Sequence, residues 1–106
     1  MKVIRKRPGE DAEIAEVEND LHALQKEVGG YIQFVPLATD FGFILNEEGK
    51  LLGLEPNVFF GSDLIVGTLL GVGLSGEEFC DVSRLVVDMI KQWLDQEEMP
   101  GEEILV

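Results

Sequence analysis

Few side chains in this sequence combine the chemistry and the spacing that metal binding requires. His22 is the only histidine and Cys80 the only cysteine. A zinc site needs several histidine, cysteine or carboxylate ligands in a fixed geometry. Acids near Cys80 in sequence, such as Asp81, disfavour the thiolate that would make the cysteine reactive. We therefore predict no metal site and no cofactor, and a single cysteine excludes an internal disulfide.

A nucleophilic hydrolase would have to use His22 as its base, with one of three serines as nucleophile. Ser62 and Ser75 stand beside glycines, a context typical of turns. Carboxylate pairs such as Glu47-Glu48 occur so often among the 21 acids that no spacing singles out an acid–base pair. We therefore expect a protein that is not an enzyme, and we keep a metal-dependent hydrolase as a third alternative.

A glycine motif could also bind phosphate. The segment 71–76 reads G-V-G-L-S-G and so matches G-x-G-x-x-G, with a predicted helix after it. In dinucleotide-binding proteins this motif belongs to a strand–helix–strand unit. No strand clearly follows the helix here, and Glu77 and Glu78 would repel a phosphate. We therefore interpret these glycines as a strand-to-helix turn.

Charge is distributed unevenly along the 106 residues. Lys and Arg number 8 and Asp and Glu 21, which gives a net charge of -13, while 45% of the residues are hydrophobic, as in ordinary globular domains. Four basic residues lie within the first seven positions, and all the acids follow. Binding of nucleic acid by counterion release requires many Lys and Arg residues, so a chain this acidic is not expected to bind nucleic acid in that way. The acids either keep a small protein soluble by self-repulsion or form a face that imitates DNA phosphates or docks on a basic partner.

The first third of the sequence predicts a hairpin and a helix. Residues 2–7 and 12–18 are predicted strands joined by a turn at Pro8-Gly9, with ion pairs between the basic and the acidic strand. A helix is predicted over about 20–28, with Asn19 as its N-cap and Gly29 as its left-handed C-cap. Such a short helix must dock its apolar stripe on a sheet.

The remainder predicts three further strands and a longer helix. The strands are expected over 31–37, 41–46 and 64–73, with a turn over 47–50, a brief strand at 51–52 and a break at 55–57. The run 64–73 is long and apolar, so we expect it to be central in the sheet. Helical spacing of apolar residues predicts an amphipathic helix over about 80–97.

Short connections between these elements favour an α+β domain. We expect a small, mostly antiparallel sheet with its helices on one side, namely a short helix after the first hairpin and a longer C-terminal helix. The domain is expected to span residues 1–98, followed by an acidic C-terminal tail over 99–106.

Three stretches of the sequence together resemble a known family. They are 28–33 (VGGYIQ), 46–57 (NEEGKLLGLEPN) and 63–68 (DLIVGT). In order and spacing they are similar to the family catalogued as domain of unknown function 3846, small proteins of phages, plasmids and integrative elements. The resemblance covers about residues 2–75. It supplies no catalytic residues, and it implies a setting in which small accessory proteins often counter host defence.

The leading hypothesis is therefore a small acidic, non-catalytic binding protein, an accessory or anti-defence factor of a mobile element that engages a host protein. No apolar run approaches the length of a membrane helix, and the N-terminus lacks the apolar core of a signal peptide. We expect a cytoplasmic protein without direct contact to membrane or nucleic acid. Trp93 in an amphipathic helix also permits a homodimer.

The alternative hypothesis is a sponge that binds a small nucleotide signal in a pocket. Its candidate residues lie where the first helix meets a strand and at two polar positions further on: Gly29, Gly30, Tyr31, Gln33, Asn46 and Asn57. A purely structural interpretation competes with this one, in which the glycines end the helix, Asn46 begins a turn and Tyr31 packs. The shortage of Lys and Arg also counts against phosphate capture.

Overall fold

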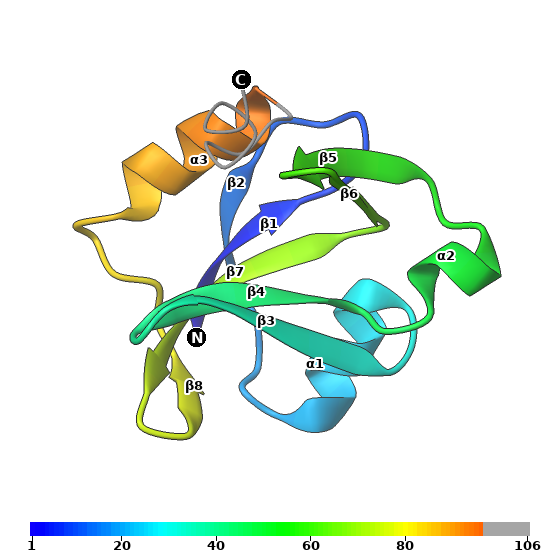
Figure 1. The fold of residues 1–106 in the computed structure, drawn as a ribbon. Coiled ribbons are helices and arrows are strands. Elements are labelled where there is room, and N and C mark those ends of the chain that lie inside the picture. The colour runs from blue at the N-terminus through cyan, green and yellow to red at the C-terminus, as the bar shows by residue number, and fades with distance from the viewer. Residues whose placement is uncertain (97–106) are drawn as a thin grey trace.

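The structure, a computed structural model, describes residues 1–96 (Figure 1), so the tail expected at 99–106 lies outside the described residues. In chain order the elements are β1 (Lys2–Lys6), β2 (Glu13–Glu16), α1 (Leu21–Val28), β3 (Ile32–Ala38), β4 (Phe41–Asn46), α2 (Gly49–Leu52), β5 (Pro56–Phe60), β6 (Asp63–Val66), β7 (Leu69–Ser75), β8 (Glu78–Cys80) and α3 (Val87–Asp95). Within this range no helix is long and apolar enough to cross a membrane.

The main sheet is built around β7. Its strand order is β2-β1-β7-β4-β3, and β8 pairs with the far half of β7 on the same edge as β1. Every strand pair is antiparallel. The expected α+β class and the mostly antiparallel sheet are therefore confirmed. Of the apolar run 64–73, predicted as one central strand, the part from Leu69 onward is central. A separate two-stranded sheet, β5-β6, was not expected.

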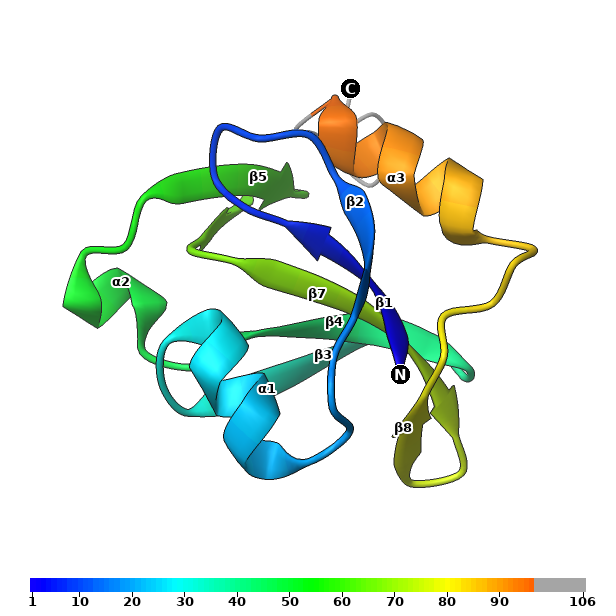
Figure 2. The same ribbon diagram turned by 180° about the vertical axis from the view of Figure 1, so that it is seen from behind.

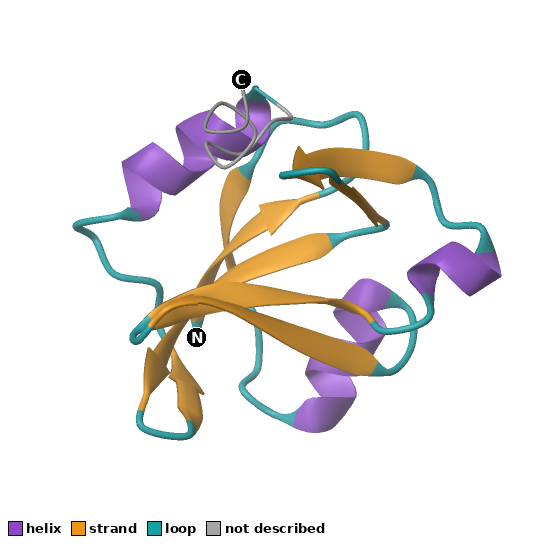
Figure 3. Cartoon of the chain, in the orientation of Figure 1, coloured by secondary structure: helices purple, strands orange, loops and turns teal. Residues whose placement is uncertain are grey.

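The expectation of helices on one side is wrong, because the sheet is covered on both faces (Figure 2). Adjacent residues of β1 show this, since Val3 packs with α1 and Ile4 packs with α3. Leu24 and Val28 of α1 complete one core. The other core holds residues of α3 and of the β5-β6 hairpin, which lie together on the opposite face in Figure 3. Side chains of successive strand residues point to opposite faces, so apolar neighbours in one strand require two covers.

The first hairpin forms as predicted, with ion pairs between its strands. Arg5 is held by Glu13 at 3.0 Å and by Glu27 of α1 at 2.7 Å, and Arg7 lies 3.8 Å from Glu13. The hydrogen bond that Nε of Arg5 donates to the Glu27 carboxylate raises the pKa of Arg5 above its ordinary value. Lys6 behaves differently, because its side chain is buried and its Nζ donates to the carbonyl oxygen of Arg7 at 3.1 Å.

Helix α1 also forms nearly where predicted, but its N-cap is one residue later. Asp20 caps the helix, since its Oδ1 accepts a hydrogen bond from the backbone N–H of Ala23 at 2.8 Å. Asn19, the predicted cap, instead donates from Nδ2 to the carbonyl oxygen of Phe79. Gly29 ends the helix in the left-handed conformation, with φ of 81°, as predicted.

The region 47–73 departs most from the prediction. Residues 49–52 form the short helix α2 in place of a turn and a strand, and the predicted break at 55–57 lies in β5. The predicted strand 64–73 is two strands, β6 and β7, because the chain bends at Gly67 with φ of 77°. At Gly67 a Cβ atom would stand 2.7 Å from Cδ1 of Leu54. Glycine at this position therefore accommodates both the positive φ of the bend and the close approach of Leu54.

The C-terminal part differs from the prediction in two ways. The glycine motif 71–76 lies in β7 and the tight turn to β8, so the expected strand-to-helix turn is a β-hairpin. Helix α3 begins at Val87, later than predicted. Val82 is held in extended chain by a bond from its N–H to the carbonyl oxygen of Lys2, and Leu85 precedes the helix and is exposed.

Gly73 permits the close approach of β7 and β8. A Cβ atom at this position would collide with the backbone oxygen of Asp81 and lie 2.9 Å from Sγ of Cys80. At Gly71 the nearest atoms are 3.3 Å and 3.4 Å away and belong to side chains.

We expect Gly73→Ala to lower the free energy of unfolding by about 2 kcal/mol, because overpacking against backbone forces the strands apart. Gly71→Ala is the matched control, with a smaller loss. Urea unfolding of both variants measures the difference. Equal losses would contradict the steric explanation.

Candidate functional site

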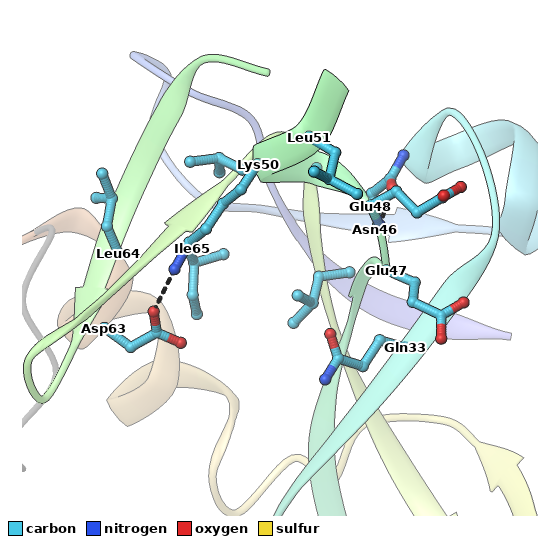
Figure 4. Close-up of a pocket in the computed structure, with 12 residues that line it drawn as sticks. Gln33, Asn46, Glu47, Glu48, Lys50, Leu51, Asp63, Leu64 and Ile65 are labelled. Atoms are coloured by element: carbon cyan, nitrogen blue, oxygen red, sulfur yellow. Dashed lines mark hydrogen bonds and ion pairs between the residues drawn. The ribbon is translucent and has the colours of Figure 1, made fainter. Parts of the chain in front are cut away.

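A cleft of about 170 Å³ lies between the end of β4 with α2 on one side and the β5-β6 hairpin on the other (Figure 4). Apolar side chains of Leu45, Ile65 and Val66 line it together with Gly49. Its polar and exposed lining residues are Gln33, Glu47, Glu48, Lys50, Leu51 and Asp63. In Figure 4 Lys50 meets Asp63 on the hairpin side, and Gln33 lies on the side of the main sheet.

Asn46 positions one wall of this cleft. Its side chain is buried, Nδ2 donates to the carbonyl oxygen of Val28 at 3.0 Å, and Oδ1 accepts from the backbone N–H of Glu48 at 2.8 Å. One amide thus connects the end of α1, the end of β4 and the start of α2. A Cβ atom at Gly30 would lie 3.0 Å from Nδ2 of Asn46, so the glycine leaves room for this amide.

Asn57 positions the other wall. Its Nδ2 donates to the carbonyl oxygens of Lys6 at 2.8 Å and of Gly67 at 2.7 Å, so the amide connects β5, the end of β1 and the bend before β7. Its Oδ1 is buried and accepts no hydrogen bond from the described residues. These bonds hold the base of the hairpin against the main sheet, and the cleft opens beyond them.

The six residues predicted to bind a ligand do not converge on one place. Gln33 and Asn46 line the cleft, and Gly29 borders a second, open depression of about 340 Å³ with Lys26 and Thr68. The structural interpretation is confirmed for the glycines and for Asn46, which begins a turn. It is wrong for Tyr31, whose side chain is 64% exposed. Ligand binding by the six residues stays a prediction.

The geometry at the end of α1 limits phosphate binding there. The N–H groups of Gly29 and Gly30 both donate to the carbonyl oxygen of Gln25, at 2.8 Å and 3.0 Å. They are therefore already used by the helix cap, whereas phosphate sites need free N–H groups or basic side chains. Lys26 in the second depression is accompanied by two acids, Glu27 and Glu55.

The charge and size of the cleft decide which groups it can accept. Three carboxylates line it against one ammonium, and that ammonium is paired, with Nζ of Lys50 2.5 Å from Oδ1 of Asp63. Small-molecule pockets usually measure roughly 300–1,000 Å³, so the cleft suits a single side chain better than a whole nucleotide. Among residues 1–96 no three His, Cys, Asp or Glu residues lie close enough to hold a metal ion.

Sequence reasoning missed Lys50, Leu51 and Asp63 as site residues. A signal was present, because the segments 46–57 and 63–68 that carry the family resemblance supply most of the cleft lining. Lys50 and Asp63 are distant in sequence, and only the hairpin fold brings them into contact.

The fold and the cleft define a small α+β protein with a two-sided core and one lateral hairpin. The chain belongs to the family described as "Domain of unknown function (DUF3846)", which matches residues 1–95. The resemblance found in the sequence is confirmed, and the match reaches the end of α3. No match was found among curated proteins or among solved structures.

We expect Asn46→Ala to lower the free energy of unfolding by about 2 kcal/mol, because the substitution leaves the buried carbonyl of Val28 without its donor. Asn19→Ala is the matched control, since Asn19 is exposed and donates one bond, and its loss should be below about 1 kcal/mol. Equilibrium unfolding in urea measures both. A loss at Asn46 no greater than at Asn19 would show that the buried amide does not hold the wall.

Proposed function

We propose that this chain is a non-catalytic binding protein whose acidic surface engages a basic protein partner. The observation that carries the proposal is the fate of the basic residues. Four of the eight basic residues are taken up within the chain: Arg5, Arg7 and Lys50 are paired with its acids, and Lys6 is buried. The other four, Lys2, Lys26, Arg84 and Lys91, stand against 17 Asp and Glu within residues 1–96. The outward field of the described residues is therefore dominated by carboxylates, and such a field attracts partners of opposite charge.

The fold also gathers acids that are far apart in sequence. The bond from Asn19 to the carbonyl of Phe79 places the connection between β2 and α1 beside β8. The backbone N–H of Lys2 donates to Oδ1 of Asp81 at 2.9 Å. We use the name acidic corner for the exposed carboxylates near these bonds: Glu18, Asp20, Glu77, Glu78 and Asp81. The acidic corner and the cleft are two separate places at which a cation can be received.

The biological setting of the proposal comes from the family. Resemblance to small proteins of phages, plasmids and integrative elements supports an accessory or anti-defence factor acting on a host protein in the cytoplasm. A partner that normally binds nucleic acid would present the basic surface that this acidic chain requires. The setting therefore agrees with the charge.

A nucleotide sponge is the second candidate and has less support. Its predicted residues are dispersed, and the N–H groups of Gly29 and Gly30 are occupied. A metal-dependent hydrolase is the third candidate, and no grouping of side chains described above favours it.

We expect an oligo-arginine peptide to bind this chain with an affinity that falls steeply as salt rises, because exposed charges are screened within about 10 Å at 0.1 M salt. Isothermal titration calorimetry over a range of salt concentrations measures the slope. An oligo-glutamate peptide of equal length is the control and should not bind. Arginine binding that is absent at low salt, or unaffected by salt, would sink the proposal.

The sponge hypothesis is tested separately by thermal unfolding with a panel of nucleotides. A ligand that binds only the folded chain raises its melting temperature. We expect no shift with any nucleotide. A shift that saturates with concentration for one of them would replace the proposed function by the alternative.

A further inference from the structure

We propose that the cleft beside α2 is the anchor for one arginine side chain of the protein partner, and that this side chain displaces Lys50 from Asp63. The inference rests on the proposed function and deepens it, because it selects one place on the acidic surface. It also defines the partner segment, a basic residue flanked by apolar residues.

Leucine side chains are exposed at the mouth of the cleft. Leu51 is 86% exposed and Leu52 58% exposed on the short helix α2, and Leu51 lines the cleft. Leu64 of the hairpin lines the same cleft. Contiguous exposed apolar patches mark protein contact sites, and Leu51 and Leu52 are adjacent on α2. A partner segment that seats a basic residue in the cleft would cover Leu51 with its neighbouring side chains.

The cleft already holds a cation of its own chain, the ammonium group of Lys50. Lys50 is 64% and Asp63 69% exposed in their side chains. Exposed ion pairs contribute only about 0–1 kcal/mol, so Lys50 can leave Asp63 at little cost. A guanidinium bonds a carboxylate through two parallel N–H groups, which an ammonium cannot do. Exchange of Lys50 for a partner arginine is therefore favourable at this carboxylate.

The size and charge of the cleft match those of a guanidinium group. The cleft is too small for a nucleotide, and Glu47, Glu48 and Asp63 oppose any anion. Gln33 lines the cleft with an exposed amide and offers a further acceptor oxygen for a guanidinium. The acidic corner has charge and one exposed leucine beside it, Leu21, but Asp20, Glu77, Glu78 and Asp81 line no cleft within residues 1–96. The cleft is therefore the more specific of the two places.

The test uses the full chain and a peptide in which arginine alternates with leucine, titrated by calorimetry. We expect Asp63→Asn to weaken binding about fivefold, as for loss of a good charged contact. Glu78→Gln removes the same charge from the acidic corner and should weaken binding less than about twofold.

Leu51→Ser should weaken binding about threefold and leave urea unfolding unchanged, since Leu51 is exposed.

The decisive readout is the sign of the effect at Lys50. Lys50→Gln removes the internal competitor and should tighten peptide binding about threefold. Lys26→Gln changes the net charge equally, away from the cleft, and should have less than half that effect. A structural role of the Lys50–Asp63 pair would instead make both Lys50→Gln and Asp63→Asn less stable without opposite effects on binding.

The outcomes separate the two proposals. If the wild-type chain binds the peptide, but Asp63→Asn and Glu78→Gln weaken binding equally, the anchor is overturned and the proposed function stands. If Lys50→Gln fails to tighten binding relative to Lys26→Gln, the displacement of Lys50 is overturned. If the wild-type chain does not bind even at low salt, the proposed function and the anchor fall together.

Discussion

Burial of β7 on both faces is the constraint on which the rest of the structure depends. Leu69 faces one core, and Leu70 and Val72 face the other, all without exposed surface. Because β1 and β4 flank this strand, they also carry apolar residues on both faces. A chain of 106 residues must then supply two covers from few elements. It uses α1 for one face and divides the other between α3 and the β5-β6 hairpin. The cleft lies at the side of this hairpin that faces the end of β4 and α2.

Two buried asparagines hold the parts of this arrangement that hydrophobic packing alone does not orient. Asn46 and Asn57 each connect three segments through hydrogen bonds to backbone groups. Burial of an amide is unfavourable unless its polar atoms are bonded. Both polar atoms of Asn46 are bonded and so select one placement of α2, whereas Asn57 holds the hairpin base through Nδ2 alone. Apolar side chains tolerate small shifts, whereas a hydrogen bond fixes distance and direction. The cleft keeps its shape because both of its walls end at such an amide.

The parts of the fold that were predictable from sequence are those determined by near neighbours. The first hairpin follows from alternation and opposite charge, and α1 follows from its apolar stripe and Gly29. The bend at Gly67 was missed, because the residues around it are as apolar as those of a continuous strand. Its partners, Leu54 and the Asn57 amide, reach it only in the folded chain. The late start of α3 also involves a residue distant in sequence. The backbone N–H of Val82 donates to the carbonyl oxygen of Lys2, so Val82 is not part of the helix. At the site, Asn46 and Asn57 could be selected from the sequence because they are polar. Only the fold shows that their side chains form hydrogen bonds to backbone groups and that Lys50 pairs with Asp63.

The β5-β6 hairpin is a sheet of its own, joined to the main sheet at its base by Asn57 and carrying Asp63 where β6 begins. Its tip, around Gly61 and Ser62, lies away from that attachment. Surface loop tips tolerate substitution and insertion better than core strands do. Ser62 at the tip can therefore be replaced by a charged residue without altering the two cores, whereas Gly61, with φ of 63°, is constrained. The charge at the far end of the hairpin can thus vary while the requirements of folding remain the same.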